Sequence, residues 1–208
     1  MEGGVPSLNQ INMETIYIYT DGACSGNPGR GGFGTILICD KGRKEISGGF
    51  RLTTNNRMEM LAVIRALEAV TAKGESREIA ISTDSKYVSD PFILGWVEKW
   101  KRNGFDRTNG DLWRKLYALV NKHNVTFNWV KGHAGHPENE ACDKLAVEAY
   151  NSERLEIDEE YESVCGSKAQ FGENETTPLL VLSESFGKMN AEAIIGVLEK
   201  SGYQITKK

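Results

Sequence analysis

The sequence is poor in the residues that build disulfide-linked or zinc-binding domains. Its 208 residues include four cysteines and three histidines. No two cysteines form a CxxC pair, and the Gly-His-Ala-Gly-His run at 132–136 does not supply a zinc-finger spacing. We therefore expect a domain that folds without disulfide bonds, in a reducing cytoplasm.

Long apolar runs are also missing. The N-terminus, Met-Glu-Gly-Gly, is not a basic start followed by an apolar segment, and no stretch is long enough to cross a bilayer. We expect a soluble, cytoplasmic monomer with no membrane contact. Hydrophobic residues make up 39% of the chain, which suits one domain of ordinary size plus an appendage.

A net positive charge, the usual mark of a nucleic-acid-binding protein, is missing from the chain as a whole. The formal net charge is −4, yet residues 1–150 carry 19 basic and 18 acidic residues, whereas residues 151–208 carry 6 and 11. The acidity belongs to the C-terminal part. The total charge therefore does not exclude a nucleic-acid partner for residues 1–150.

What the chain does contain is an ordered series of strand and helix patterns. Glycine-rich turns are predicted at 26–32 and 41–42. Strands are predicted at 16–20, 33–39, 45–52, 78–83 and 125–130, and helices at 55–70, 87–100, 111–123 and 137–150. This order predicts an α/β domain with a five-stranded mixed sheet, in which an antiparallel meander precedes parallel strands covered by helices.

Composition divides the chain into four parts. We predict an N-terminal tail at 1–13, a main domain at 14–150, an acidic, turn-rich linker at 151–177 and a small βαβ-like α/β module at 178–208. Tyr161, Val164 and Phe171 of the linker could dock on a neighbouring surface. The module would have a thin core alone, so we expect it to pack on the main domain or bind a protein partner.

Two predicted strands end in the same way, each with an aspartate. Asp21 closes Tyr-Thr-Asp-Gly and Asp84 closes Ser-Thr-Asp-Ser. Ligands of open α/β sheets gather at the carboxyl ends of strands. For either acid alone, the commoner explanation is an aspartate that starts a turn.

Two further acids lie on predicted helices. Projected at 100° per residue, Glu59 falls within an apolar arc of its helix, where a solvated glutamate is not expected; pairing with a buried arginine is the alternative. Asp143 lies between Cys142 and an apolar face, one turn after Asn139, and could equally be an ordinary solvated residue.

Together, the four acids point to a divalent-metal site. Carboxylate oxygens are the ligands preferred by Mg²⁺ or Mn²⁺ rather than zinc. Two ions would hold the attacking water and the leaving oxygen of a phosphodiester displacement. Without metal, mutual repulsion should raise at least one carboxyl pKa. The predicted metal ligands are Asp21, Glu59, Asp84 and Asp143.

His133 lies in a glycine-flanked loop and is the candidate for proton transfer. A mobile imidazole near the acids could accept a proton from the attacking water or pass one to the product. The alternative is a solvated loop histidine, which is the interpretation we keep for His136.

At this point the chain resembles the type I ribonucleases H of bacteria over residues 14–150. The resemblance rests on four segments in order, Tyr-Thr-Asp-Gly-Ala-Cys-Ser-Gly-Asn-Pro-Gly, Thr-Thr-Asn-Asn-Arg-Met-Glu-Met, Ser-Thr-Asp-Ser-Lys-Tyr-Val and Trp-Val-Lys-Gly-His-Ala-Gly-His-Pro-Glu-Asn-Glu. It implies a ribonuclease H-like fold with helices on both faces of the sheet. It also implies that the four acids hold two Mg²⁺ ions, with Mn²⁺ as a substitute, and that His133 assists turnover.

The resemblance implies the substrate as well: the RNA strand of an RNA–DNA hybrid, cut to leave 5′-phosphate and 3′-hydroxyl ends. The 2′-hydroxyl lets a protein tell the two strands apart. By similarity, the RNA strand is bound by Cys24, Asn27, Asn55 and Asn56, and the DNA strand by Thr54, Tyr87, Trp96, Trp100 and Asn109. Trp100 at i+4 from Trp96 could equally face the core. The basic segment comprises Lys99, Lys101, Arg102 and Arg107.

The sequence departs from the family pattern in three places. Leu52 stands where many relatives carry arginine, the basic segment is shortened, and the acidic C-terminal part has no family assignment. The first two predict a weaker hold on phosphates and a shallower salt dependence. The competing hypotheses are a binding module that has lost the chemistry, and a related nuclease or integrase that acts on DNA.

Overall fold

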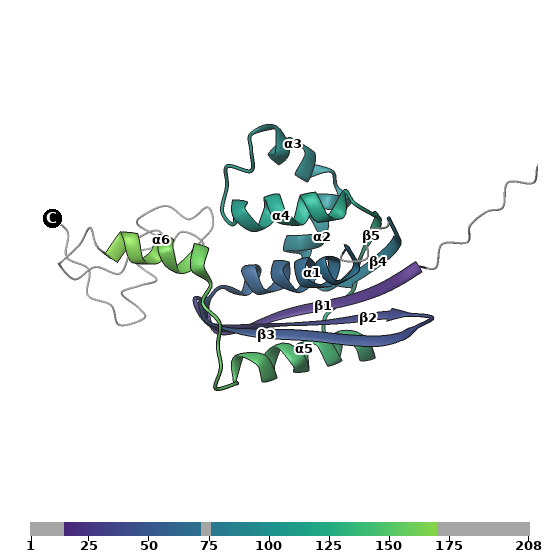
Figure 1. The fold of residues 1–208 in the computed structure, drawn as a ribbon, viewed down its shortest axis with the longest axis horizontal. Helices are drawn as coiled ribbons and strands as arrows, with labels where there is room; N and C mark the ends of the chain where they lie inside the picture. The colour runs from purple at the N-terminus through teal and green to yellow at the C-terminus, as the bar shows by residue number, and fades with distance from the viewer. Residues whose placement is uncertain (1–14, 72–75, 170–208) are drawn as a thin grey trace, which may run out of the picture. The chain divides into compact units, whose positions relative to one another are not determined.

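The computed structural model describes residues 15–71 and 76–169 (Figure 1). The chain divides into two compact units, Met1–Tyr161 and Glu162–Lys208. The predicted module at 178–208 and the tail at 1–13 lie outside the described residues. None of the helices in the described ranges has the length and apolar character needed to span a membrane.

A five-stranded mixed sheet forms the centre of the first unit. Its strands follow the order β3-β2-β1-β4-β5; β1 to β3 are antiparallel, while β1, β4 and β5 run parallel. The strands are β1 (Thr15–Gly26), β2 (Gly29–Cys39), β3 (Gly42–Thr53), β4 (Glu78–Thr83) and β5 (Asn124–Trp129). The predicted α/β fold class is confirmed.

Helices cover both faces of this sheet. Figure 1 shows α5 (Pro137–Tyr150) on one face, against β1, β2 and β3, and α1 (Asn55–Thr71) on the other. The helix α4 (Gly110–Val120) packs on α1, and α2 (Lys86–Ile93) packs near β4 and β5. The remaining helices of the described ranges are α3 (Trp96–Arg102) and α6 (Glu159–Ala169).

The first helix is almost wholly buried because both of its sides meet other elements. Met58, Ala62 and Val63 are among its fully buried side chains. They join a core that includes Trp113 of α4 and Ile18 of β1. Glu59 therefore lies near the start of a helix that is buried on both sides, as its place in the predicted arc required.

The prediction of one helix over 87–100 was wrong. The structure ends α2 at Ile93 and starts α3 at Trp96, with Gly95 between them at φ +71°. A left-handed residue cannot continue a right-handed helix, and glycine adopts that conformation without steric cost. The break leaves Trp96 exposed at the start of α3.

The prediction of a turn at Gly31-Gly32 was also wrong. β1 runs to Gly26 and β2 resumes at Gly29, so both glycines lie inside a strand. A Cβ on Gly32 would clash with the carbonyl oxygen of Ala146. Gly32 therefore serves the close approach of α5 to the sheet, whereas a Cβ on Gly31 would clash with side chains of Cys24, Thr53 and Met58.

The first part of the predicted linker is bonded to the sheet. The backbone amide of Glu156 donates to the carbonyl of Gly49, and that of Arg51 donates to the carbonyl of Glu156. Asp158 is 6% exposed. The compact unit accordingly reaches Tyr161.

Candidate functional site

Strand register brings Asp21 and Asp84 together. Thr20 of β1 pairs with Thr83 of β4 in a parallel ladder, so the residues that follow them leave the pair side by side. The amide of Gly22 donates a 2.7 Å hydrogen bond to Oδ1 of Asp21. The two aspartates that ended separate sequence patterns thus meet where β4 stops, with Asp21 inside β1 and Asp84 just after β4.

A glycine brings Glu59 to the same place. A Cβ on Gly22 would clash with the backbone nitrogen of Glu59, so only glycine lets the first turn of α1 approach β1 so closely. One carboxylate oxygen each from Asp21, Glu59 and Asp84 lie within 4.8 Å of one another. We call these three residues the acid cluster.

Asp143 lies next to the acid cluster, although it is not one of the three. Gly34 pairs with Asp21 across the β1–β2 ladder, and a Cβ on Gly34 would clash with the carbonyl oxygen of Cys142. The next residue of α5 is Asp143, whose charge raises the pKa of Asp21. Asp143 is half-buried, so the solvated alternative does not describe it fully.

Burial and mutual repulsion change the charge state of the acid cluster. Burial, followed by the charge of Asp84, raises the pKa of Asp21 to about 7. Burial, followed by the charges of Asp21 and Asp84, raises the pKa of Glu59 well above its ordinary value. The expected rise in carboxyl pKa is confirmed, and protonation is what keeps such a group stable without a cation.

Two buried oxygens around the acids have no hydrogen-bond partner. They are Oε2 of Glu59 and Oδ1 of Asn139, in residues 8% and 4% exposed. The other oxygen of Glu59 accepts a 3.4 Å bond from Asn55. An all-oxygen set with an unsatisfied buried carboxylate fits a hard divalent cation.

Pairing with a buried arginine, the alternative explanation for Glu59, does not hold. The buried arginine of this helix is Arg57, and its salt bridges are with Asp111 and Asp158. Glu59 instead faces two other acids.

Sequence reasoning gave no role to two residues that hold Asp84. Nδ2 of Asn139 lies 3.4 Å from Oδ2 of Asp84, and Nε1 of Trp129 donates a 2.9 Å bond to its carbonyl oxygen. Asn139 lies one turn before Asp143 on α5, and Trp129 pairs with Thr83, the residue before Asp84. These positions were the signals in the sequence that could have identified the two residues, but their meaning becomes clear only once the fold is known.

His133 lies in the loop between β5 and α5. It is exposed and has φ +51°. The adjoining Gly132 packs so closely on Asp84 that a Cβ there would clash with Oδ2 of the carboxylate. His133 is therefore one residue from a direct contact with the acid cluster. His136 is the N-cap residue of α5 and is exposed.

The predicted RNA-binding residues gather beside Glu59. Oδ1 of Asn27, in the β1–β2 turn, accepts a 3.1 Å bond from the amide of Asn55 at the start of α1. Asn56 is exposed next to them. The charge of Glu59 adds to burial in raising the pKa of Cys24 to about 12, which places that thiol near the acid.

The predicted DNA-binding residues comprise two polar side chains and three aromatic ones. Nδ2 of Asn109 donates to the hydroxyl of Tyr87 at 3.1 Å, and Thr54, the residue after β3, is buried. Trp100 is half-buried, with its ring 5.0 Å from that of Trp113, so part of it belongs to the core. Trp96 is 49% exposed.

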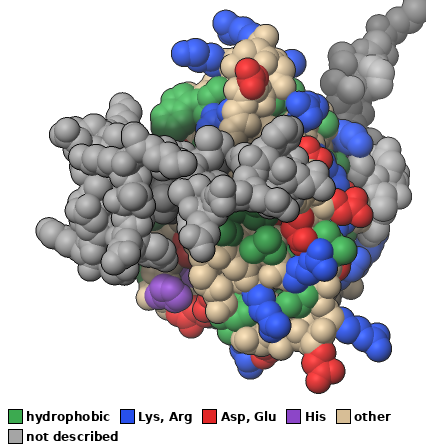
Figure 2. Space-filling view, turned by 90° about the vertical axis from the view of Figure 1, so that its left-hand side faces the viewer, with side chains coloured by type: hydrophobic (Ala, Val, Ile, Leu, Met, Phe, Trp, Pro, Cys, Tyr) green, Lys and Arg blue, Asp and Glu red, His purple; other side chains and the backbone are tan. Residues whose placement is uncertain are grey.

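Three of the four residues in the basic segment are exposed cations. Lys99, Lys101 and Arg102 lie in the last turn of α3, and Figure 2 shows Lys and Arg side chains spread over one face of the molecule. Arg107 differs because its guanidinium lies 3.4 Å from the centre of the Trp100 ring. Burial lowers the pKa of Arg107.

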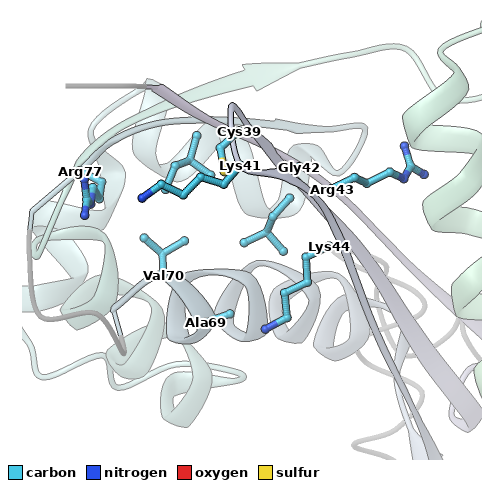
Figure 3. A pocket seen from close by; sticks show the side chains of 10 residues that line it. Cys39, Lys41, Gly42, Arg43, Lys44, Ala69, Val70 and Arg77 are labelled. Carbon is cyan, nitrogen blue, oxygen red and sulfur yellow. The ribbon is translucent and has the colours of Figure 1, made fainter. Parts of the chain in front are cut away.

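A hollow elsewhere in the molecule does not hold the candidate chemistry. It lies between the β2–β3 turn and the far end of α1, and Figure 3 shows Lys41 and Lys44 beside it. Ala69, at its base, is ten residues along α1 from Glu59, about 15 Å. Arg43 is paired with Glu45 at 2.9 Å. We therefore place the chemistry at the acid cluster.

Comparisons with known proteins agree on one family. The model of the RNase H family matches residues 13–151. The chain is 56% identical to a ribonuclease H of Rippkaea orientalis over 154 residues, covering 71% of this chain and 93% of that protein. It is 52% identical to a ribonuclease H of Desulforamulus reducens over 153 residues, covering 71% and 94%.

Solved structures give the same result. The crystal structure of LC9-RNase H1, a type 1 RNase H, matches with a TM-score of 0.62 and 30% identity, over 81% of this chain and 86% of that one. LC11-RNase H1 in complex with an RNA/DNA hybrid matches with a TM-score of 0.53 and 28% identity, over 65% and 96%.

Proposed function

Because the chain belongs to the ribonuclease H family, we propose that it is an endonuclease that hydrolyses the RNA strand of RNA–DNA hybrids, leaving 5′-phosphate and 3′-hydroxyl ends. The observation that carries the proposal is the acid cluster, with three carboxylates within 4.8 Å of one another. It lies beside Asn27 and Asn55, where a nucleic-acid strand can be held. The hybrid in the LC11-RNase H1 complex supports the choice of substrate.

We propose Mg²⁺ as the cofactor, with Mn²⁺ as a substitute. Asp21, Glu59, Asp84 and Asp143 would hold two ions, and the unsatisfied Oε2 of Glu59 supports this donor set. When bound, such ions stabilise negative charge on the phosphate and lower the pKa of a water nucleophile. The metal also favours the ionised acids, because it offsets the burial and repulsion that raise the pKa of Asp21.

The protein groups around the cluster have distinct proposed roles. Asn139 and Trp129 hold Asp84 at its carboxylate and its carbonyl. His133 moves a proton between the reacting water or the departing oxygen and solvent, which suits an exposed imidazole next to the loop contact with Asp84. None of these proposed roles involves a covalent bond between the protein and the substrate.

Strand discrimination is proposed to follow from two separate groups of polar side chains. Cys24, Asn27, Asn55 and Asn56 surround the start of α1 and would contact the ribose 2′-hydroxyls. Thr54 and Asn109 would hold a DNA phosphate, while Tyr87, Trp96 and Trp100 offer apolar faces to DNA sugars. The exposed cations of α3 add a contact to phosphates that does not depend on sequence.

The critical test is Asp84→Asn with a hybrid whose RNA strand is labelled, in the presence of Mg²⁺. The amide keeps the shape and removes the charge, so we expect cleavage to fall at least about a hundredfold, more than the loss for a residue that only supports a ligand. Glu148→Gln, at an exposed position of α5, is the control and should leave cleavage unchanged. Cleavage that persists in Asp84→Asn would refute the metal assignment.

The same assay separates the competing functions. A chain that binds hybrid in a gel-shift experiment but never cuts it, across titrations of Mg²⁺ and Mn²⁺, would be a binding module. Cleavage of a duplex that contains only deoxyribose would indicate a nuclease acting on DNA. We expect cleavage of the hybrid alone, because only its RNA strand carries 2′-hydroxyls.

A further inference from the structure

A buried arginine at the start of α1 has every one of its N–H groups bonded. Arg57 is 3% exposed. Its Nε and Nη2 donate to the two carboxylate oxygens of Asp158 at 2.7 and 2.8 Å. Nη2 and Nη1 donate to Asp111 at 2.8 and 3.0 Å. The fifth bond, from Nη1 at 3.4 Å, goes to Oδ1 of Asn109. A guanidinium has five N–H donors in a planar fork, so this one is fully used.

The fifth bond decides how the Asn109 amide is turned. Its Oδ1 faces Arg57, so its Nδ2 faces the other way and donates to the hydroxyl of Tyr87. A turned amide would place N–H groups against a cation that can only donate. The backbone is also constrained, since Asn109 has φ +59° as the N-cap residue of α4. The second hydrogen of Nδ2 is available for an acceptor.

Asp158 reaches this network from beyond α5. Besides Arg57, it accepts a 2.7 Å bond from the hydroxyl of Thr53, the residue before Thr54. The preceding Glu156 is bonded to Gly49 of β3. A carboxylate 6% exposed therefore joins the end of β3 to the start of α1 and, through Arg57, to the start of α4.

We propose that Asp158 and Arg57 are positioning residues that aim Nδ2 of Asn109 at a phosphate of the bound nucleic acid. The inference rests on the proposed function and adds to it a residue outside the 14–150 range. Asp158 holds one edge of the guanidinium, Asp111 holds the other, and the remaining N–H fixes the amide. Lysine cannot replace this arginine, because an ammonium lacks the planar fork.

A positioning role for Asp158 and a purely electrostatic effect predict opposite changes in the affinity for nucleic acid when the charge of Asp158 is removed. Nucleic acid is a polyanion, so removing a negative charge near its binding site should tighten binding if the field alone matters. If Asp158 orients Asn109, removing it should weaken binding. Asp158→Asn isolates this question because it keeps the side-chain shape and changes the charge.

The experiment is a double-mutant cycle on the full chain, with the dissociation constant of an RNA–DNA hybrid as the readout. We expect Asp158→Asn and Asn109→Ala each to weaken binding about tenfold, the scale of one hydrogen bond to a charged group. The double variant should be no weaker than Asn109→Ala alone, because both changes remove the same contact. In steady-state kinetics, KM for the hybrid should rise, while kcat at saturating hybrid stays near its original value.

A merely structural role would give a different result. Leu67→Ala, in the buried middle of α1, lowers stability without touching the network and should leave the dissociation constant unchanged. Arg57→Lys is the second variant and should reproduce the Asp158→Asn effect. Additive losses in the cycle, or tighter binding by Asp158→Asn, would overturn the inference.

Failure of the inference is distinguishable from failure of the proposed function. An unmodified chain that cuts hybrid while the cycle is additive refutes only the positioning role. An unmodified chain that binds hybrid without cutting it refutes the nuclease, and the non-additive cycle would still support the positioning role. A chain that does not bind hybrid overturns both.

Discussion

Asp21 shows how a side chain suited to metal binding is costly in the metal-free protein. Its pKa is raised from 3.8 to about 7, mainly by burial and then by Asp84. At pH values between 3.8 and about 7, Asp21 is protonated in the folded protein and ionised in the unfolded chain, so the folded protein binds more protons. Its stability therefore falls as pH rises from about 4 to about 7, and above pH 7 the ionised group destabilises the fold.

Asp21→Asn should accordingly stabilise the metal-free protein at pH 8. The amide can still accept the bond from Gly22 and carries no charge, so the gain should be on the order of a few kcal/mol. At pH 4 the gain should be small, because the native carboxyl is already protonated. The measurement is the melting temperature in the presence of a chelator at both pH values.

The matched control for Asp21→Asn is Glu153→Gln, which removes an acid at an exposed position. It should leave the melting temperature unchanged at both pH values. An equal effect of Asp21→Asn at pH 4 and pH 8 would contradict the proposed charge state. Adding Mg²⁺ should stabilise the unmodified protein more than the Asp21→Asn variant, since the metal binds the folded acids.

At the scale of elements, glycines decide how closely the helices approach the sheet. Gly34→Ala should push α5 away from β2, because the new methyl group would meet the carbonyl oxygen of Cys142. We expect a loss of about 1–3 kcal/mol in the free energy of unfolding. We also expect kcat to fall more than hybrid affinity, because Asp143 follows Cys142. Urea denaturation and steady-state kinetics measure the two effects.

Ser47→Ala is the control for the Gly34 substitution. Ser47 is the partner of Gly34 in the β2–β3 ladder and is exposed. Its replacement should change stability by less than about 0.5 kcal/mol. If Gly34→Ala were equally harmless, the close approach of α5 would not be needed to place Asp143.

Elements with strong local signals were predictable from the sequence. β4 and α5 have the predicted bounds because an apolar run ends before Asp84 and a proline opens α5. The split between α2 and α3 and the place of Gly31-Gly32 were not predictable locally. In the first case a glycine in the left-handed conformation separates the two helices. In the second case Gly32 packs against α5, a helix more than a hundred residues away.

The residues of the candidate site also divide into those with a local signal in the sequence and those without one. Asp21, Glu59 and Asp84 each had a local signal, either a strand end or an apolar arc, and the structure brings them together. The network of Arg57 had none. Asp111 and Asp158 lie 54 and 101 residues from the arginine they hold, and no periodicity connects such positions.

At the scale of the whole molecule, the position of the domain boundary depends on a buried charge, the carboxylate of Asp158, as well as on composition. A chain that ends at Tyr150 would lose Asp158 and leave Arg57 buried with Asp111 alone. Removing one partner of a buried ion pair costs about 3–5 kcal/mol, because the remaining charge stays desolvated. We expect a chain ending at Tyr161 to be more stable than one ending at Tyr150 by about this amount, as measured by urea denaturation.

Asp158→Ala in the full chain is the control that identifies the cause. It retains residues 151–208, including the bonds of Glu156 to β3, and should still lose most of the stability that the chain ending at Tyr150 loses. A full-chain variant as stable as the original would mean that the backbone bonds of this segment, rather than the carboxylate, hold it. Equal stability of the two shortened chains would instead place the domain boundary at residue 150, because neither the bonds of Glu156 nor the Arg57 pair would then contribute.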